Sequence, residues 1–417
     1  MRRYVERHET LRIGREVLCA KQNERKCLMP GVMQGIRVIE LAAWVAGPST
    51  GGILADWGAD VIKIEPPHGD PLRAIQEASG PEAAGNPFFD PDNRGKRSIV
   101  LNLRDDEQRE RALALVDTAD VFISNMRPSA LKRLGFDHET LLSRDRRLIY
   151  ALITGYGLSG PGAGAGAFDL GACWARGGIA DLLSVPGQDL PLQRSGMGDH
   201  FAGVAAVAGI SAALYHRERT GEGQLVSTSL VRVAAYQVSS DLNTKLMTNR
   251  DPAHPVRTSP DNPLSNNYTA GDGRRFWLLG IESDRHWPAL TRIVERQDWA
   301  SDERFATAPA RTVNAKELVS ALDDIFATRP RVEWARRFDA EKDFFWSPVN
   351  DVAEMLADPQ TAASGVIVEA ADGSSGRPMV ATPVDFAKTP ASVRTRAPRL
   401  GEHTDELLAG LPERGRR

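Results

Sequence analysis

The chain reads IRVIELAAWVAGPSTGGILADWGADVIKIE between Ile36 and Glu65, and this stretch decides the fold class. Its first six residues are a short run rich in β-branched side chains, which predicts a β-strand. A turn at Ala46-Gly47-Pro48 precedes helical character over Ser49–Trp57, and the apolar run Val61–Ile64 predicts a second strand. The order strand, helix, strand predicts a β-α-β unit.

The same alternation continues along the chain. Strands are predicted at Ser98–Leu103, Asp120–Ser124 and Arg147–Thr154, with a helix over Asp105–Thr118 and another that ends near Leu142. Alternating strands and helices predict an α/β fold whose mostly parallel sheet is covered on both faces. Because ligands bind at the carboxyl ends of such strands, we expect a site in the turns that follow them.

The second half of the chain is less regular. Residues 154–198 are rich in Gly, Pro and Ala and predict a long structured loop with a functional role. Helices are predicted over Asp199–Arg219 and Leu225–Leu246, followed by a linker over Arg250–Asn267. A smaller block then begins with a strand at Arg275–Gly280, and the last 70 or so residues predict short strands and helices.

Composition excludes several classes of protein. The 417 residues are 41% hydrophobic and 26% charged, proportions typical of a soluble globular protein with two or three domains. A formal net charge of -3 supplies no field for nucleic acid or an anionic membrane, and no continuous apolar run approaches the span of a bilayer. Three cysteines without metal-like spacing, and a mixed-charge stretch at residues 1–31 without the features of an export signal, favour a cytoplasmic location.

Common catalytic motifs are missing. The first turn lacks the GxGxxG spacing of dinucleotide-binding enzymes, which disfavours hydride transfer with a nicotinamide or flavin. The sequence also lacks a GxxxxGK[ST] phosphate loop and a GxSxG nucleophile elbow. The eight histidines are scattered without metal-ligand spacing, so no metal site is predicted.

Two aspartates and two basic stretches are candidates for chemistry. Asp199 stands at the start of a predicted helix, where it is either an N-cap or a carboxylate nucleophile stabilised by the helix. Asp169 lies in the long loop as an Asx-turn residue or a second acid. The stretches Asn93–Ser98 and Arg127–Arg133 are either solvated surface or binding sites for phosphate.

The order of several short motifs resembles the family III CoA-transferases, which include formyl-CoA:oxalate and carnitine CoA-transferases, and the related α-methylacyl-CoA racemases. The similarity covers nearly everything after Met33. The matching stretches are Gly35–Glu40, Ala46–Pro48, Leu54–Glu65, Asn93–Ser98, Ala119–Val121, Asn125–Pro128, Arg147–Ala151, Gly198-Asp199, Arg219–Gln224 and Leu400–Thr404.

The resemblance implies a Rossmann-like large domain formed by both chain ends, a smaller α+β domain, and a homodimer whose subunits interlock like chain links. On this sequence it places an N-terminal extension at residues 1–33 and the first part of the large, CoA-binding domain at 34–230. A linker at 231–270, the small domain at 271–345 and a return to the large domain at 346–417 complete the expected organisation.

The resemblance also implies that CoA is the group carried between substrates rather than a tightly bound cofactor. The implied partners are an acyl-CoA donor and a carboxylic acid acceptor. Residues that match CoA-contacting positions of the family are Leu101, Arg104, Asn125, Met126 and Arg133. The adenine-stacking arginine of formyl-CoA transferase falls at Pro66 here, and Arg73 is the nearby candidate to replace it.

Asp199 matches the nucleophilic aspartate of the family, and Asp169 matches a neighbouring acidic position with a supporting role. The aspartate would carry the acyl group as an anhydride and then CoA as a thioester. Backbone N–H groups near Gly196, Gly198 and the Ala46-Gly47 turn are candidates to stabilise the oxyanions.

Substrate preference is indicated by the residues expected around the acyl group. The glutamine that faces the site in formyl-CoA transferase becomes Val45 here, and Trp44 and Phe168 add apolar surface. These three residues predict an acyl pocket more apolar than one made for oxalate.

Three other functions stay open at this stage. A racemase would move the α-proton of a thioester between two groups, and it needs a histidine where this chain has Phe168, although Asp199 and Glu282 match racemase acidic positions. A CoA-binding protein without catalysis is the second alternative, and a hydride-transferring Rossmann enzyme is the third.

Overall fold

The computed structural model describes residues 31–79, 85–254, 256–370, 373 and 378–411. The predicted N-terminal extension therefore lies outside the described residues up to position 30. The described chain divides into two compact units. Unit 1 contains the residues up to Asp169, then Gly196–Val233, then the residues from Ile367 onward. Unit 2 contains Leu170–Ser195 and Ala234–Val366.

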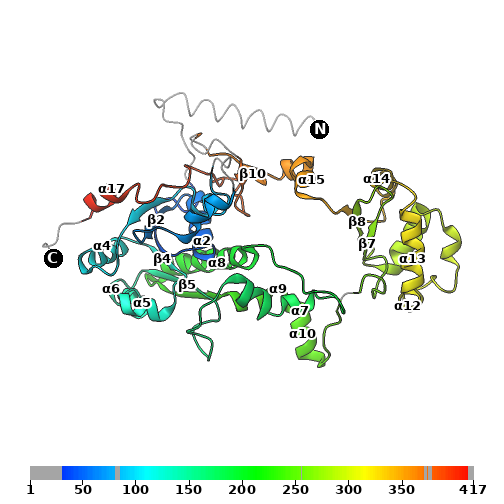
Figure 1. Ribbon diagram of the computed structural model, residues 1–417, viewed down its shortest axis with the longest axis horizontal. Coiled ribbons are helices and arrows are strands. Elements are labelled where there is room, and N and C mark those ends of the chain that lie inside the picture. Colours follow the sequence, from blue (N-terminus) through cyan, green and yellow to red (C-terminus); the bar gives the residue numbers. More distant parts are fainter. Residues whose placement is uncertain (1–30, 80–84, 255, 371–372, 374–377, 412–417) are drawn as a thin grey trace. The chain divides into compact units, whose positions relative to one another are not determined.

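A six-stranded parallel sheet organises unit 1 (Figure 1). Its order is β3-β2-β1-β4-β5-β6, which is the strand order of a doubly wound dinucleotide-type fold. In the register, Val38 of β1 lies opposite Val61 of β2 and Val121 of β4. The strands are β1 (Arg37–Leu41), β2 (Asp60–Glu65), β3 (Arg97–Val100), β4 (Val121–Ser124), β5 (Ile149–Thr154) and β6 (Gln224–Ser229).

Alternate residues of each strand point to opposite faces of the sheet, and a hydrophobic core packs against each face. Ile39 and Phe122 pack on one face with residues of α4, α5, α6 and α17. Val38 and Val121 pack on the other face with residues of α2 and α8. The helices are α2 (Ala46–Asp56), α3 (Asp90–Asn93), α4 (Asp106–Val116), α5 (Pro128–Leu134), α6 (His138–Arg144), α8 (Met197–Thr220) and α17 (Thr404–Ala409), with a 3-10 helix η1 at Pro71–Ser79.

Helix α8 is long and apolar enough to cross a membrane by length and composition alone. It packs against α2 and against strands β5 and β6, which is the place of a core helix in a layered domain. Its small residues permit this close approach, because a Cβ at Gly203 would lie 2.3 Å from the Ser49 hydroxyl of α2. The two helices that begin at the same edge of the sheet are therefore in direct contact.

The helix predicted over Leu225–Leu246 is wrong in its first part. Gln224–Ser229 form β6, which pairs with β5 from Ile149↔Gln224 to Thr154↔Ser229. The β-branched Val226 and Thr228 favour extended backbone, and the open edge of β5 supplies the hydrogen-bonding partners that a helix would otherwise provide. Two helices follow, α9 (Leu230–Gln237) and α10 (Ser239–Thr248), where the sequence predicted a linker at 231–270.

Unit 2 has a core dominated by aromatic side chains, among them Tyr268, Phe276, Trp299 and Trp334. They pack between the antiparallel sheet β7-β8-β9 and the helices that follow it. Unit 2 also takes in 170–195 and 346–366, which the sequence placed with the large domain. Its elements are η2 (Leu170–Ala175), α7 (Ile179–Leu182), β7 (Asn267–Thr269), β8 (Arg275–Leu278), α11 (Ser283–Ile293), η3 (Gln297–Ala300), α12 (Ala308–Val313), α13 (Ala315–Phe326), α14 (Arg331–Ala340), β9 (Trp346–Pro348), α15 (Val352–Ala357) and α16 (Pro359–Ala363); the pair β10 (Ile367–Val368) and β11 (Met379–Val380) belongs to unit 1.

Candidate active site

A cavity of about 710 Å³ opens in unit 1 where strands β1, β4, β5 and β6 end. The strand order reverses between β1 and β4, and the crevice at such a switch point is where open α/β sheets bind ligands. The structure brings six of the predicted site residues to this cavity: Trp44, Asn125, Met126, Arg133, Phe168 and Asp199. The cavity therefore lies at the carboxyl edge, where the sequence predicted a site.

Asp199 lies in the first turn of α8, at the third helical residue. The N-cap is Gly196, which has a left-handed conformation with φ +77° and makes no side-chain cap. The interpretation of Asp199 as the N-cap is therefore wrong. Instead of capping the N-terminus of α8, the Asp199 side chain forms part of the cavity wall.

The capping role belongs to Asp169. Its Oδ2 accepts a hydrogen bond from the Gly198 N–H at 3.1 Å, and its side chain is buried. The Gly198 N–H is consequently occupied, so the expectation that it serves as an oxyanion donor is corrected. Asp169 supports Asp199 by fixing the first turn of the helix that carries it.

Electrostatics set Asp199 apart from ordinary aspartates. Burial, and after it the charge of Asp169, raises the pKa of Asp199 to about 7. His200 opposes this rise, because its own pKa is raised by a hydrogen bond to Asp92, whose oxygens lie 3.2 Å from Nε2. His200 is not among the predicted site residues, although its position directly after Asp199 could have indicated it. Perturbed titration of this kind is typical of groups that do chemistry.

Helix α2 also begins at the cavity, with Ala46 in its lining. No residue in the described part of the chain accepts a hydrogen bond from the N–H of Ala46 or Gly47. Pro48 has no N–H, and the Ser49 N–H is bonded to the Val45 carbonyl at 2.8 Å. The N–H groups of Ala46 and Gly47 therefore have no partner among the described residues, and Ala46 is the one of the two that lines the cavity; their role as oxyanion donors stays a prediction.

Aromatic surface adjoins these donors. Trp44 and Phe168 pack edge to face with ring centroids 5.4 Å apart, and the Phe168 side chain is 65% exposed. Val45, which was predicted to line the acyl pocket, is not among the residues that line the cavity. It is half-buried beside the start of α8, where a Cβ at Gly196 would lie 3.5 Å from a Val45 methyl group. The apolar character expected near Asp199 is thus supplied mainly by the two rings.

Three arginines at the carboxyl edge have exposed side chains: Arg127 and Arg133, which line the cavity, and Arg104 beyond the end of β3. None of them forms an ion pair with any residue that the structure describes. Unpaired guanidinium groups at strand ends are suited to bind phosphate. Arg104 does not line the cavity itself, although it stands at the same edge of the sheet.

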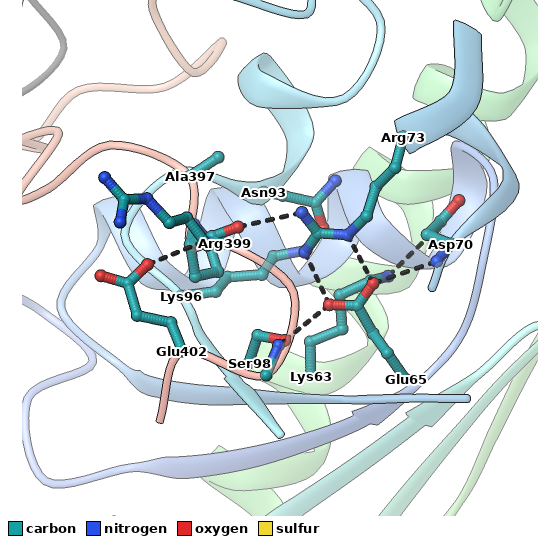
Figure 2. A network of polar contacts seen from close by, with 12 residues as sticks. Lys63, Glu65, Asp70, Arg73, Asn93, Lys96, Ser98, Ala397, Arg399 and Glu402 are labelled. Carbon is teal, nitrogen blue, oxygen red and sulfur yellow. Dashed lines mark hydrogen bonds and ion pairs between the residues drawn. The ribbon is translucent and has the colours of Figure 1, made fainter. Parts of the chain in front are cut away.

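Two predicted CoA contacts are placed elsewhere by the structure. Leu101, directly after β3, is buried in the core on one face of the sheet. Arg73 donates two hydrogen bonds of 2.7 Å to Glu65 (Figure 2). It also donates to the Pro398 carbonyl at 3.0 Å, and its guanidinium carbon lies 4.0 Å from the centre of the Phe89 ring. These partners hold the Arg73 guanidinium group in place within the protein, and its replacement of the adenine-stacking arginine stays a prediction.

Within the described ranges there is no group of three or more His, Cys, Asp or Glu side chains arranged to hold a metal ion. The donors that the cavity does offer are backbone N–H groups and guanidinium groups, which bind carboxylates, thioester oxygens and phosphates. The site is therefore built for an anionic or carbonyl-bearing ligand with apolar parts.

Comparison with known proteins agrees with this chemistry. The model of CoA-transferase family III matches residues 33–404. The chain is 35% identical to succinate–glutarate CoA-transferase of Agrobacterium fabrum, covering 91% of this chain and 95% of that protein. It is 30% identical to (R)-2-hydroxy-4-methylpentanoate CoA-transferase of Clostridioides difficile, with the same coverage.

A solved structure is similar throughout. A CaiB/BaiF family protein from Brucella suis superimposes with a TM-score of 0.80 and 32% identity, covering 92% of this chain and all of that one. Enzymes of this family use acyl-CoA donors and carboxylate acceptors, with CoA as the group transferred. The chain belongs to CoA-transferase family III.

Proposed function

We propose that this enzyme exchanges CoA between two carboxylic acids through covalent intermediates on Asp199. One observation carries the proposal: a carboxyl group with a pKa near 7 stands in a cavity that is also lined by Ala46, at the start of α2, and by two arginines without an ion pair to any described residue. A carboxylate that is poorly solvated is a better nucleophile than one in water. The arginines supply the charge that CoA phosphates need.

The proposed reaction has four steps, and in each of them an acyl group passes from one oxygen or sulfur atom to another. The Asp199 carboxylate attacks the acyl-CoA carbonyl, the C–S bond breaks, and an acyl-aspartyl anhydride and the CoA thiolate result. The thiolate attacks the aspartyl carbonyl and releases the donor acid, leaving an aspartyl-CoA thioester. The acceptor carboxylate attacks this thioester, and CoA leaves again as thiolate. The thiolate then attacks the acceptor's acyl carbonyl, which yields the new acyl-CoA and restores Asp199.

Other groups have supporting roles in this scheme. Each attack places negative charge on a carbonyl oxygen, and the N–H groups of Ala46 and Gly47 are the donors proposed to stabilise it. Arg127, Arg133 and Arg104 are proposed to bind the phosphates of CoA, with Asn125 and Met126 beside its pantetheine arm. Asp169 holds the first turn of α8 in place.

We propose a mid-sized acyl group, branched or aromatic, as the preferred substrate. Support comes from the exposed pair Trp44 and Phe168, whose rings would be desolvated by an apolar acyl chain. Relatives are named for 2-hydroxy-4-methylpentanoate and for cinnamoyl-CoA and phenyllactate, but also for succinate, glutarate and mesaconate. The aromatic pair favours the first group of acids over the dicarboxylates.

A homodimer is also proposed. Helix α10 buries none of its residues, and the apolar side chains of Leu246 and Met247 are 80% and 82% exposed. Tyr236 on α9 is 75% exposed. Surface of this kind usually marks an interface, and a second copy of the chain, interlocked as in the family, is the proposed partner. Light scattering of the wild type and of Leu246→Glu tests it: a monomeric wild type would contradict the proposal.

Intact-protein mass spectrometry tests the proposed reaction. The protein is incubated briefly with a panel of acyl-CoA thioesters, beside Asp199→Asn and beside Asp106→Asn, an exposed aspartate of α4 that serves as a matched control. An adduct with the mass of bound CoA is expected in the wild type and in Asp106→Asn only. Exchange of the substrate α-proton in deuterated water, without an adduct, would instead identify the racemase reaction.

A further inference from the structure

Trp44 has a left-handed backbone conformation, which residues other than glycine rarely adopt. Its φ is +66°, in the left-handed region, which costs a bulky L-residue on the order of 1–2 kcal/mol. The residue lies between the end of β1 and the N–H groups of Ala46 and Gly47 at the start of α2. Such a conformation persists only where surrounding contacts determine it.

Side chains from three other segments hold the backbone of residues 42–44. Lys63 donates to the Ala42 carbonyl at 2.8 Å. The Asn125 amide accepts from the Ala43 N–H at 3.1 Å and donates to the Ala43 carbonyl at 2.6 Å. The Asp70 carboxylate accepts from the Trp44 N–H at 3.3 Å. Three successive residues are therefore fixed by groups that are distant in sequence.

Lys63 and Asp70 belong to a fully buried charge cluster that also contains Glu40 and Lys96. Lys63 Nζ lies 2.9 Å from Glu40 and 3.0 Å from Asp70, and Lys96 Nζ lies 2.7 Å from Glu40. Lys96 also donates to the Pro48 carbonyl in the first turn of α2, at 2.8 Å. Two cations and two anions thus neutralise each other directly beneath the loop and the helix start.

This cluster is anchored further by Glu65 (Figure 2). Glu65 accepts from the Asp70 N–H at 3.0 Å, from the Ser98 hydroxyl at 2.7 Å and from Arg73. Arg73 in turn donates to the carbonyl of Pro398, so the C-terminal segment is tied to the same cluster. Burying this much charge is costly, and it yields little net stability over apolar packing. A role in fixing geometry accounts for the cluster better than a role in stability.

We propose that Asp70 and Lys63 are positioning residues that hold residues 42–47 so that the N–H groups of Ala46 and Gly47 face the reacting carbonyl. Gly47 shows how tightly the loop is folded, because a Cβ there would lie 2.5 Å from the Ala42 methyl group. This inference rests on the proposed function, since it assumes that the acyl carbonyl binds at the start of α2. Neither residue touches the substrate in this assignment.

The test compares Asp70→Ala with Asp56→Ala. Asp56 is an equally buried carboxylate, at the far end of α2, paired with Arg94 at 2.7 Å. Both variants are expected to lose stability, but only Asp70→Ala is expected to lower kcat, by 10- to 100-fold, with KM for acyl-CoA changed less than threefold. Amide hydrogen exchange in the peptide that spans residues 42–47 is expected to accelerate in Asp70→Ala and not in Asp56→Ala.

A second variant keeps the test valid if Asp70→Ala fails to fold. Lys63→Met/Asp70→Leu removes both charges together, leaves the Glu40–Lys96 pair, and is expected to show the same loss of kcat. The replacement Trp44→Asn, which tolerates left-handed backbone, is expected to reduce the effect of Asp70→Ala at least threefold. Equal losses of kcat in the Asp70 and Asp56 variants would overturn the inference.

The mass-spectrometric adduct separates this inference from the proposed function. If the wild type forms no adduct, the proposed function fails, whatever the variants do. If the wild type and Asp70→Ala form the Asp199 adduct at the same rate, the proposed function stands and the positioning role is wrong. The expected result is a slower adduct in Asp70→Ala and an unchanged rate in Asp56→Ala.

Discussion

Unit 1 has a cavity at each edge of its sheet, and the larger one is not the candidate site. The cavity at the amino edge, about 850 Å³, is lined by the residues that begin β1, β2 and β3. Two of its arginines have anionic partners, because Arg97 pairs with Asp60 at 2.6 Å and Arg396 with Glu402 at 2.7 Å, whereas Arg394 forms no ion pair with a described residue. At the carboxyl edge, Arg127 and Arg133 have none among the described residues.

Carboxyl groups show the same contrast. Arg396 lowers the pKa of Glu402 at the amino edge to about 2, whereas burial raises that of Asp199 at the carboxyl edge to about 7. Arg396 donates hydrogen bonds to the Glu402 carboxylate, whereas the Asp199 carboxyl group has no hydrogen-bond or ion-pair partner among the described residues. The difference teaches that a carboxyl group with a raised pKa, and not cavity volume, singles out the carboxyl edge as the candidate site.

The largest expected effect is on catalysis. Asp199→Asn removes the nucleophile and is expected to lower the rate of CoA transfer by about 1,000-fold or more. Glu406→Gln, which removes a charge at the amino-edge cavity, is expected to change the rate less than twofold. Chromatographic measurement of acyl-CoA exchange checks both variants. Comparable losses in the two would erase the contrast between the cavities.

The next effect is on stability and its pH dependence. Between its unfolded pKa of 3.8 and its folded pKa near 7, Asp199 binds a proton in the folded state only, so wild-type stability falls as pH rises through this range. Asp199→Asn is therefore expected to be more stable than wild type at pH 8, by on the order of 2 kcal/mol, and not at pH 4.

Glu402→Gln at the amino edge has the opposite expectation. The depressed pKa of Glu402 contributes stability that is present above pH 4.5 and is lost as pH falls toward 2. This variant is expected to be less stable than wild type at pH 8, with the difference shrinking in acid. Denaturant unfolding at several pH values measures both variants, and a shift of the same sign in both would contradict the electrostatic comparison.

Smaller effects are expected from the arginines. Arg133→Ala and Arg127→Ala each are expected to raise KM for acyl-CoA by about 5- to 10-fold with little change in kcat, because they bind the part of the substrate that does not react. Added salt is expected to weaken binding by the wild type more than by the variants. Arg396→Ala, at the other cavity, serves as the control and is expected to leave KM unchanged.

The smallest effect concerns substrate choice. Phe168→Ala is expected to lower kcat/KM for branched or aromatic acyl-CoA by about threefold to tenfold relative to acetyl-CoA, since it removes one ring of the edge-to-face pair. Competition between two thioesters in one reaction gives the ratio directly. An unchanged ratio would mean that the aromatic pair does not contact the acyl group.

The sequence predicted the β-α-β order, the carboxyl-edge site and the helix that carries Asp199, because each depends on local periodicity or on a rule of parallel sheets. It missed β6, since the β-branched residues at 226 and 228 are a weak local signal and the pairing that fixes the strand is with β5, about 75 residues earlier in the chain. The hydrogen bonds that hold the backbone of Ala43 and Trp44 could not be predicted from the sequence either. They join backbone groups to side chains 82 and 26 positions away, which no local pattern encodes.

The hydrogen bond between Asp169 and Gly198 has a consequence for the evolution of the enzyme. Residues 170–195 leave unit 1 after Asp169 and return at Gly196, so this bond fastens the exit of the excursion to its re-entry. Once both ends are fixed, lengthening the excursion costs only about 0.6 kcal/mol for each doubling of its length. Insertions and deletions there can therefore change unit 2 while Asp199 keeps its place in the first turn of α8.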